Sequence, residues 1–475
     1  MSSPTSSRAV IISLLLTTGL GACAALPTTP PAQTLKSPAA YASATSLAAP
    51  AAEWPTDQWW TAYGDTQLNS LMDEALAGSP DLAKAQARLA KAQAAMAQAR
   101  AATLPSVTAN GSYASAKQSY NNGIPAAFVP QGYNDSGRAT LDFAWELDFF
   151  GKNRAALAAA TSDAEAAKAD AAEARLLLST NIAAAYAQLA QQFADRDAAQ
   201  DAAKIREQSA ALTAERAGNG LENQGAVEQA KARLASARAD LAATDEQIGL
   251  TRNRLAALLG AGPDRGRSIA RPAALAIKAF GLPADLSADL IGRRPDVVAA
   301  RLRAESASQR IKQAKAQFYP AVNLSAYFGQ QSLGLDLLSN AGSRIGSIGP
   351  AVRLPIFEGG ALRANYRGAA ADYDAAVASY NGTLTQALQD VADAAVSGRA
   401  LDVRLSESRT ALQASTAAHD IAVQRYRGAL STYLDVLTAE DAMIANQRAV
   451  ADLETRAFTL DVALVRALGG GYRAA

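Results

Sequence analysis

The residue types that most often carry chemistry are scarce in this chain of 475 residues, which has one cysteine, Cys23, and one histidine, His419. A single cysteine cannot form an internal disulfide, and these two residues cannot complete a Cys/His zinc site. A Ser-His-Asp triad would need His419, but residues 416–421 predict a helix with no nucleophile elbow nearby. We therefore expect His419 to be a solvated helix residue, and the sequence argues against an enzyme, a cofactor or a resident metal.

Cys23 fits a different chemistry, the attachment of lipid. Arg8 precedes an apolar run over residues 9–20, which is too short to span a bilayer and is typical of a secretory signal. The run ends in Leu-Gly-Ala-Cys, which resembles a bacterial lipobox. We expect residues 1–22 to be a lipoprotein signal peptide and Cys23 to be acylated, because several acyl chains anchor a protein stably. An ordinary signal with an incidental cysteine is the alternative.

The composition predicts a mainly helical protein and argues against a nucleic-acid-binding protein. About a quarter of the residues are alanine, the best helix former, and only 6% are aromatic. The chain has 45 Lys and Arg against 44 Asp and Glu, so it lacks the basic excess of a nucleic-acid binder. The sequence predicts closely packed helices in place of a wide globular core.

The mature chain consists of two similar halves. Pro105 matches Pro320 at an offset of 215, and Gly151 matches Gly360 at an offset of 209. The change of offset falls inside a longer loop of the first half, and agreement over such a length indicates a tandem duplication. We divide the chain as follows: lipidated tether 23–52, first repeat 53–260, equatorial connection 261–290, second repeat 291–470 and C-terminal tail 471–475.

Each repeat carries a short helix, a β-hairpin and a long helical hairpin. The expected β-hairpins span 106–148 and 321–357, and residues 139–147 alternate apolar and polar side chains as lipid-facing barrel strands do. A soluble hairpin packed on helices is the alternative. Four strands cannot close a barrel, and open edges are not tolerated in lipid. Several chains must therefore contribute if these strands lie in a membrane.

The helical hairpins, expected over 152–260 and 361–469, are too long for a globular core. Residues 152–216 contain neither Pro nor Gly, and at helical rise they would span roughly 97 Å. The last helix carries apolar residues seven apart, a heptad seam that predicts a coiled coil. These residues are Leu430, Leu437, Ile444, Ala451, Phe458 and Val465.

Four motifs together resemble the TolC-type outer-membrane efflux proteins, and the lipobox and the Trp-Trp pair favour the NodT/OprM-like lipoprotein branch. The motifs begin at Trp59, Trp145, Leu282 and Pro355, and the one from Leu282 is completed by residues 293–296. The resemblance implies a mixed α+β membrane protein: a homotrimer whose four strands per chain form a 12-stranded outer-membrane barrel, continued by a periplasmic tunnel of helical hairpins.

The same resemblance implies a passive exit duct for small toxic compounds or drugs, anchored by lipid in the bacterial outer membrane. Its partners would be a periplasmic membrane-fusion adaptor protein, an inner-membrane resistance-nodulation-division transporter and outer-membrane lipid, with no nucleic acid. A type I protein-secretion duct and a structural periplasmic coiled-coil protein are the alternatives.

By position, the resemblance implies a periplasmic gate made of Arg425, Tyr426 and Leu434. The sequence does not choose the acidic partner of the gate; the candidates are Asp195, Asp197, Asp201, Glu207 and Glu222. Thr438 occupies the place where some relatives carry an acidic ring, and Asp435 lies nearby on another helical face, so the sequence does not decide whether a cation-binding ring exists. The expected adaptor contacts are the hairpin tips: Gly218, Asn219, Gly220, Arg427, Gly428 and Leu430.

Overall fold

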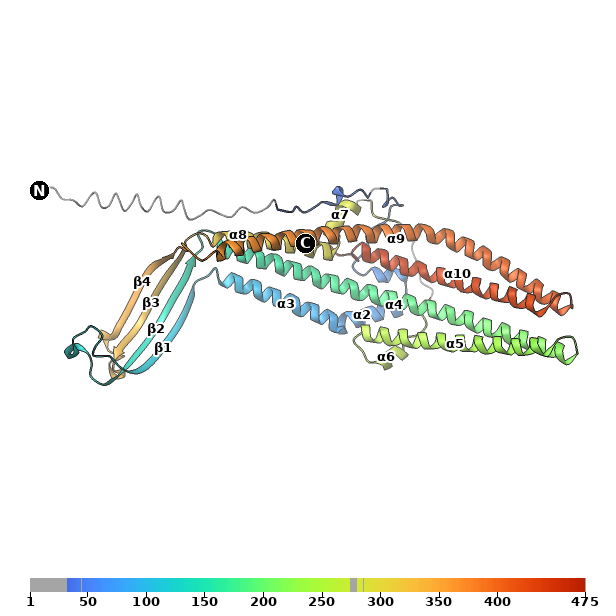
Figure 1. Cartoon of the computed structure of the whole chain (residues 1–475), viewed down its shortest axis with the longest axis horizontal. Coiled ribbons are helices and arrows are strands. Elements are labelled where there is room, and N and C mark those ends of the chain that lie inside the picture. The colour runs from blue at the N-terminus through green and yellow to red at the C-terminus, as the bar shows by residue number, and fades with distance from the viewer. Residues whose placement is uncertain (1–31, 44, 274–279, 285, 475) are drawn as a thin grey trace. The chain divides into compact units, whose positions relative to one another are not determined.

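The computed structural model describes residues 32–474 except 44, 274–279 and 285 (Figure 1). The expected signal peptide and Cys23 lie outside the described residues. The chain divides into two compact units. Unit 1 contains residues 89–167 and 300–380, and unit 2 contains residues 36–88, 168–299 and 381–475.

Unit 1 contains one antiparallel sheet of four strands in the order β1-β2-β3-β4 (Figure 1). The strands are β1 (Ser106–Lys117), β2 (Tyr133–Leu147), β3 (Ala321–Leu333) and β4 (Arg344–Arg353). The two hairpins of the duplicated halves therefore pair with each other through β2 and β3. Within this sheet β1 and β4 each keep one unpaired edge.

The register separates the side chains of the sheet into an apolar and a polar face. Leu141 lies opposite Phe328, and Ala326 lies opposite Ile348; Leu141, Phe328 and Ile348 are all more than half exposed. The residues between them face the other way because side chains alternate along a strand. On that side the Asn110 side-chain amide donates to Asp142 at 2.8 Å.

Strand β4 is shorter than the second hairpin expected from the sequence. It ends at Arg353, two residues before Pro355, and the strand does not reach Ile356 and Phe357. Pro355 cannot donate to a ladder and restricts the residue before it, although the edge strand β4 tolerates Pro350 within its own length. Both following apolar side chains are exposed, at 81% and 90%.

The helices repeat with the same two offsets as the sequence. The short helices are α3 (Pro80–Ala101) and α8 (Pro295–Ala316). The long hairpins are α4 (Lys152–Gly218) with α5 (Gln224–Leu258), and α9 (Ala361–Arg427) with α10 (Tyr433–Ala467). Offsets of 215 and 209 carry the first set onto the second at both ends of every helix, as expected for a duplication. In the described part of the chain, no helix combines the length and apolar character needed to cross a membrane.

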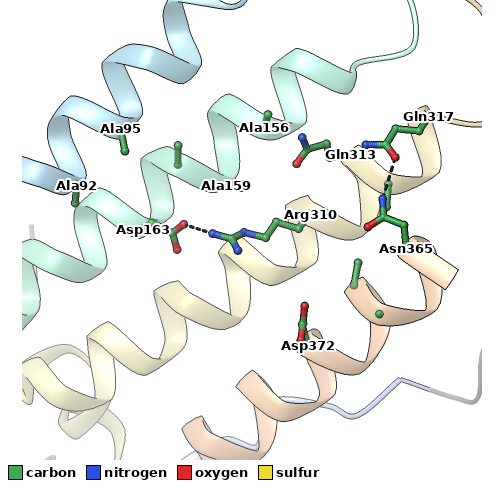
Figure 2. Close-up of a pocket in the computed structure, with 14 residues that line it drawn as sticks. Ala92, Ala95, Ala156, Ala159, Asp163, Arg310, Gln313, Gln317, Asn365 and Asp372 are labelled. Carbon is green, nitrogen blue, oxygen red and sulfur yellow. Dashed lines mark hydrogen bonds and ion pairs between the residues drawn. The ribbon is translucent and has the colours of Figure 1, made fainter. Parts of the chain in front are cut away.

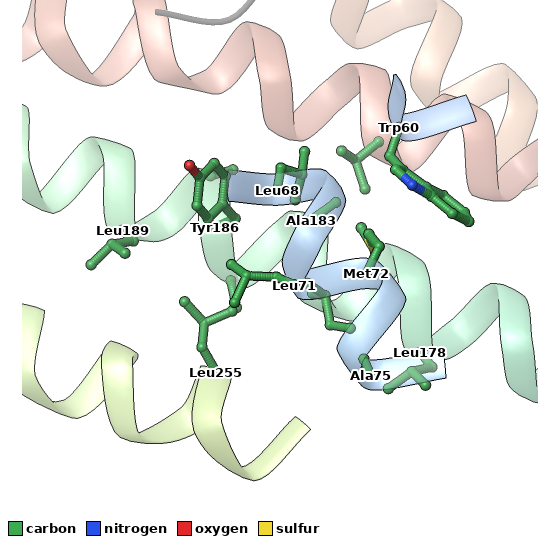
Figure 3. Packing of buried hydrophobic residues seen from close by; sticks show 14 of the residues in the cluster. Trp60, Leu68, Leu71, Met72, Ala75, Leu178, Ala183, Tyr186, Leu189 and Leu255 are labelled. Carbon is green, nitrogen blue, oxygen red and sulfur yellow. The ribbon is translucent and has the colours of Figure 1, made fainter. Parts of the chain in front are cut away.

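Unit 2 has an aromatic and aliphatic core beside the middle of its long helices. A short 3-10 helix (Trp59–Tyr63) and α2 (Thr66–Gly78) supply much of it, and Figure 3 shows Leu71 and Met72 of α2 facing the long helices. The Asp65 carboxylate caps α2 and accepts the Tyr186 hydroxyl at 2.7 Å. The connection between the repeats adds α6 (Pro263–Arg267) and α7 (Leu286–Arg293).

The described part of the tether is bound to α9. The Lys36 amide donates to the Asn381 side chain at 3.0 Å, and the Arg399 guanidinium donates to the Ala48 carbonyl at 3.1 Å. Next to it, Ala51 forms an isolated parallel bridge with Leu282. These backbone contacts need no apolar pattern, which is why the composition of the tether gave no sign of them.

The predicted heptad seam is buried at three positions of α10 and half-buried at Ala451 and Val465, but it is exposed at the tip. Leu437, Ile444 and Phe458 are at most 5% exposed. Leu430, which we expected to begin the seam, is 72% exposed and lies before α10 starts at Tyr433. That expectation was wrong because the chain is still turning between α9 and α10 at this position.

Candidate functional site: the tips of the helical hairpins

The tip of the first hairpin is a glycine turn closed by a cap. Gly218, Asn219 and Gly220 are exposed, and Gly220 has φ +75°, a conformation that costs glycine little. The Asn223 side chain then accepts from the Ala226 amide at 3.0 Å and starts α5.

The backbone of the second tip makes the same turn as that of the first tip, but with different residues. Ala429 takes the place of Gly220 in the duplication and has φ +58°, the one positive φ among the described non-glycine residues. Thr432 and Asp435 form a capping box at the start of α10. The local hydrogen bonds from Ala429 and Leu430 to the carbonyls of Tyr426 and Arg425 hold this turn.

Tyr426 joins the two tips within one chain. Its side chain is 1% exposed, and its hydroxyl donates to Glu222 Oε2 at 3.1 Å. The Arg216 guanidinium lies 4.6 Å from the centre of the Tyr426 ring and also donates to the Arg427 carbonyl. The ring also packs against Tyr433, with the ring centres 5.7 Å apart. The Arg216 guanidinium and the Glu222 carboxylate of the first hairpin thus hold the Tyr426 side chain of the second hairpin.

Burial keeps these tyrosines protonated. Burial is the main cause that raises the pKa of Tyr426 above its usual value, and the Glu222 carboxylate adds to it. Burial, with the charge of Glu440, raises the pKa of Tyr433 to about 12. Tyr426 therefore remains a hydrogen-bond donor at any physiological pH.

A buried ionic network lies next to this cluster. The Glu440 carboxylate on α10 is 1% exposed and accepts from Arg206 at 3.3 Å and from Ser209 at 3.0 Å, both on α4. Arg206 also contacts Asp441 at 3.1 Å, and Arg233 of α5 contacts the same carboxylate at 2.5 Å. A buried charge is tolerated where it is paired and hydrogen-bonded, as here.

The structure selects one of the five acidic candidates and separates the three predicted gate residues. Glu222 is the partner of Tyr426, whereas Asp197 pairs with Arg271 and Glu207 pairs with Arg238. Among the described residues Arg425 has no ion-pair or hydrogen-bond partner for its side chain, and Leu434 is 65% exposed. Both are therefore accessible on the surface of a single chain.

The sequence analysis missed Arg216 and the Arg206–Glu440 network. Arg216 could have been found, because it matches Arg425 at the offset of 209. Nothing in the spacing of Arg206 and Glu440, which are 234 residues apart, indicates that they meet.

His419 is not the solvated residue that we expected. Its side chain is 12% exposed, and Nε2 is buried without a hydrogen-bond partner. It lines a cavity of about 310 Å³ with Tyr426 and Tyr433, because the coiled coil turns this face of α9 towards α4. Within the described residues, no cluster of three or more His, Cys, Asp or Glu side chains could hold a metal ion.

The sheet with an exposed apolar face and the pair of long helical hairpins define a channel-forming membrane protein, not an enzyme. A family model described as "Outer membrane efflux protein" matches residues 71–261 and 286–470. The chain therefore belongs to the outer membrane efflux protein family. The four antiparallel strands and long helical hairpins are the fold of the TolC-type channels.

Relatives and solved structures agree with this membership. The chain is 30% identical over 429 residues to multidrug resistance outer membrane protein MdtP of Escherichia coli, covering 89% of this chain and 88% of the relative. It is 36% identical over 320 residues to fusaric acid resistance protein FusA of Burkholderia cepacia, covering 66% and 59%. The crystal structure of outer membrane protein VceC of Vibrio cholerae has 46% identity and a TM-score of 0.85, covering 88% of this chain and 100% of that one.

Proposed function

We propose that three copies of this chain form the outer-membrane exit duct of a tripartite efflux pump for small toxic compounds. The observation that carries the proposal is the sheet: one face is apolar and exposed, and two edges are unpaired. Lipid would cover the face, and neighbouring copies would pair with the edges, since open edges do not persist in a bilayer. Three sheets of four strands would close a 12-stranded barrel.

The helical hairpins would continue this barrel as a periplasmic tunnel. A periplasmic membrane-fusion adaptor would contact the exposed tips, and an inner-membrane resistance-nodulation-division transporter would supply the energy. The names of the MdtP and FusA relatives, which refer to resistance to drugs and to fusaric acid, support small toxic compounds as cargo. Lipid on Cys23 would add an anchor in the outer membrane, in the lipoprotein branch of the family.

A pair of neighbouring substitutions on β4 tests the membrane assignment. Ile348→Arg places a charge on the apolar face and should cost about 2–4 kcal/mol of insertion free energy at the bilayer midplane. Ser347→Arg, its control, lies on the polar face and should insert normally. Heat-modified gel mobility and recovery in outer-membrane fractions measure insertion, and equal recovery of both variants would contradict the assignment.

Function and anchoring need separate measurements. In a host that lacks its own exit duct but has a cognate pump and adaptor, the chain should raise the inhibitory concentrations of drugs. Release of a protein cargo without drug resistance would instead indicate a type I secretion duct. Mass spectrometry of the N-terminal peptide should find Cys23 acylated, and an unmodified thiol would refute the anchor.

A further inference from the structure

The pairing register of the sheet follows the duplication. The pair of Ser106 with Ala144 joins β1 to β2, and the offsets of 215 and 209 carry it onto the pair of Ala321 with Arg353, which joins β3 to β4. The strands of the second repeat are therefore paired in the same register as those of the first repeat.

The two repeats meet within unit 1 in one consistent order. β2 of the first repeat pairs with β3 of the second, and Asp163 of α4 forms an ion pair with Arg310 of α8 at 2.7 Å (Figure 2). In both contacts a later element of the first repeat meets an earlier element of the second. In a closed ring of identical chains, the unpaired edge of β4 therefore meets the unpaired edge of β1 of the next copy.

The same offsets give the register of this seam between copies. They carry the pair of Gly137 with Ser332 onto a pair of Gly346 with Lys117 of the next copy. Arg344 lies two residues before Gly346 and on the same face of the sheet. Its side chain is then a diagonal neighbour of Lys117 across the seam, at about 7–8 Å.

Lys117 and Arg344 lie on the apolar side of the sheet, at its end away from the helices (Figure 1). Two-residue steps along β4 lead from Ile348 to Arg344, so both residues face the same way. Lys117 pairs with Tyr133, which is 77% exposed and is a residue type that gathers at membrane interfaces.

The length of β1 places these cations at the level of lipid headgroups. Lys117 lies ten positions beyond Val107, about 33 Å along the strand, which at a barrel tilt of about 40° is about 25 Å of height. This equals the height of the apolar band of an outer-membrane barrel. The helices continue from the periplasmic end, so the cations lie at the boundary of the outer leaflet.

Nothing in the described chain neutralises the two cations. Both side chains are exposed without an ion-pair partner among the described residues, and Lys117 Nζ lies 5.5 Å from the centre of the Tyr120 ring. Asp135 is the only acidic residue on the apolar side of the four described strands, and the Tyr113 hydroxyl hydrogen-bonds to it.

The cations gather only at the seams between copies. The offset of 209 carries Asp135 onto Arg344, and the offset of 215 carries Lys117 onto Ser332. The seam between β2 and β3 inside a chain thus has a carboxylate and a hydroxyl where the seam between copies has a guanidinium and an ammonium group.

We propose that each of the three seams binds a phosphate group of an outer-leaflet glycolipid between Lys117 of one copy and Arg344 of the next. The inference rests on the trimeric barrel proposed above. Arginine can bind phosphate through two parallel N–H donors, and lysine adds a point charge. The acyl chains would cover the apolar face below the cations, which includes Ile348, and this contact favours a lipid over a free anion.

A disulfide between copies tests the register of the seam. Lys117→Cys with Gly346→Cys places two thiols directly opposite each other, within the Cβ separation that a disulfide needs. Mild oxidation should link the copies covalently on a non-reducing gel, whereas Lys117→Cys alone should not link them. A trimeric double-cysteine protein that stays unlinked would overturn the register and the site with it.

Native mass spectrometry of the purified trimer with added lipid A, a phosphorylated glycolipid, tests the binding. The parent should retain up to three lipid molecules. Lys117→Gln with Arg344→Gln should weaken binding by at least about tenfold, because it removes both charged donors. Arg138→Gln is the matched control: it removes a cation from the same end of the sheet but on the polar face, and should bind like the parent.

Two further probes distinguish the source of the phosphate. Lipid A without its phosphates should bind as weakly to the parent as lipid A binds to the double glutamine variant. Inorganic phosphate at the same concentration should not displace lipid A, because it lacks the acyl chains. Equal binding of the dephosphorylated lipid, displacement by inorganic phosphate, or parent-like binding by the double glutamine variant would each overturn the proposal. A parent that is not trimeric would instead refute the proposed channel.

Discussion

Glu173 on α4 has a carboxyl group whose protonated form is favoured in the folded protein. Burial, with the nearby Asp296 charge, raises its pKa to about 7 although Arg294 and Arg466 act in the opposite direction. A raised carboxyl pKa stabilises the folded state fully below the unfolded value near 4.5, and this contribution is lost as pH rises through about 7. We expect Glu173→Gln to stabilise the protein at pH 8 by about 1–2 kcal/mol and to have little effect at pH 5.

Thermal unfolding of the detergent-solubilised protein at the two pH values measures this difference. Glu215→Gln is the control, because it makes the same change on the exposed end of the same helix. A Glu173→Gln variant with the same pH profile as the parent would show that this carboxyl group does not titrate between pH 5 and 8.

At the residue scale the sequence did not predict the partners of the side chains that it singled out at the tips. Tyr426 was identified through a family motif, but its partner Glu222 was one of five acidic candidates. The choice depends on which helix face turns towards the other hairpin, and alanine-rich helices carry little periodic signal to fix it. His419 was misjudged for the same reason.

Among the contacts between helices, the buried ionic network between α4 and α10 should be the one whose stability is most sensitive to a single substitution. Glu440→Leu would leave Arg206 buried with only Asp441 as partner and should cost about 3 kcal/mol of stability. Replacing both members, as Arg206→Met with Glu440→Leu, should recover most of this loss, because well-packed apolar residues can replace a buried pair. Asp441 keeps Arg233 in either variant.

Thermal unfolding followed by helix circular dichroism compares the three proteins. If the double variant is as unstable as the single one, the carboxylate and guanidinium contribute more than mutual neutralisation. If Glu440→Leu unfolds like the parent, the network is not a stabilising element of the hairpin.

The elements themselves were largely predictable from the sequence. A long stretch without Pro or Gly predicted α4, the duplication predicted α9 as its counterpart, and alternation together with the duplication predicted the strands. The sequence could not predict which strands of the two hairpins pair with each other. β2 pairs with β3 because the two repeats meet there, and neither hairpin alone indicates this pairing. The contacts of residues 36–52 with α9 were missed because they use the backbone.

In the whole assembly, the duplication distinguishes two kinds of contact between hairpins. Within a chain, Arg216 and Glu222 of the first hairpin hold Tyr426 of the second. The offset of 209 carries Tyr426 back to Ala217, so the corresponding contact between copies lacks the aromatic ring. Contacts between copies should therefore be weaker than those within a chain, and opening should begin there.

The last prediction concerns this opening. Arg425 is the duplicate of Arg216 and is exposed without a partner in the described chain, so its five N–H donors are free to bind carboxylates or amides of the next copy. An exposed pair contributes about 0.5 kcal/mol, and three copies together would favour closure by about tenfold. Arg425→Ala with Tyr426→Phe should raise the open fraction by about that factor in single-channel recordings. Leu434→Ser should act in the same direction by removing an apolar side chain from the aperture.

Arg404→Ala provides the matched control, because it removes an exposed arginine from the same helix far from the tip. It should conduct like the parent. Tyr426→Phe alone separates the two kinds of contact: it should loosen the hairpins within each chain while leaving Arg425 in place. If all gate variants remain trimeric and conduct like the parent, then neither Arg425 nor Leu434 closes the tunnel, and the narrowest point lies elsewhere along the helices.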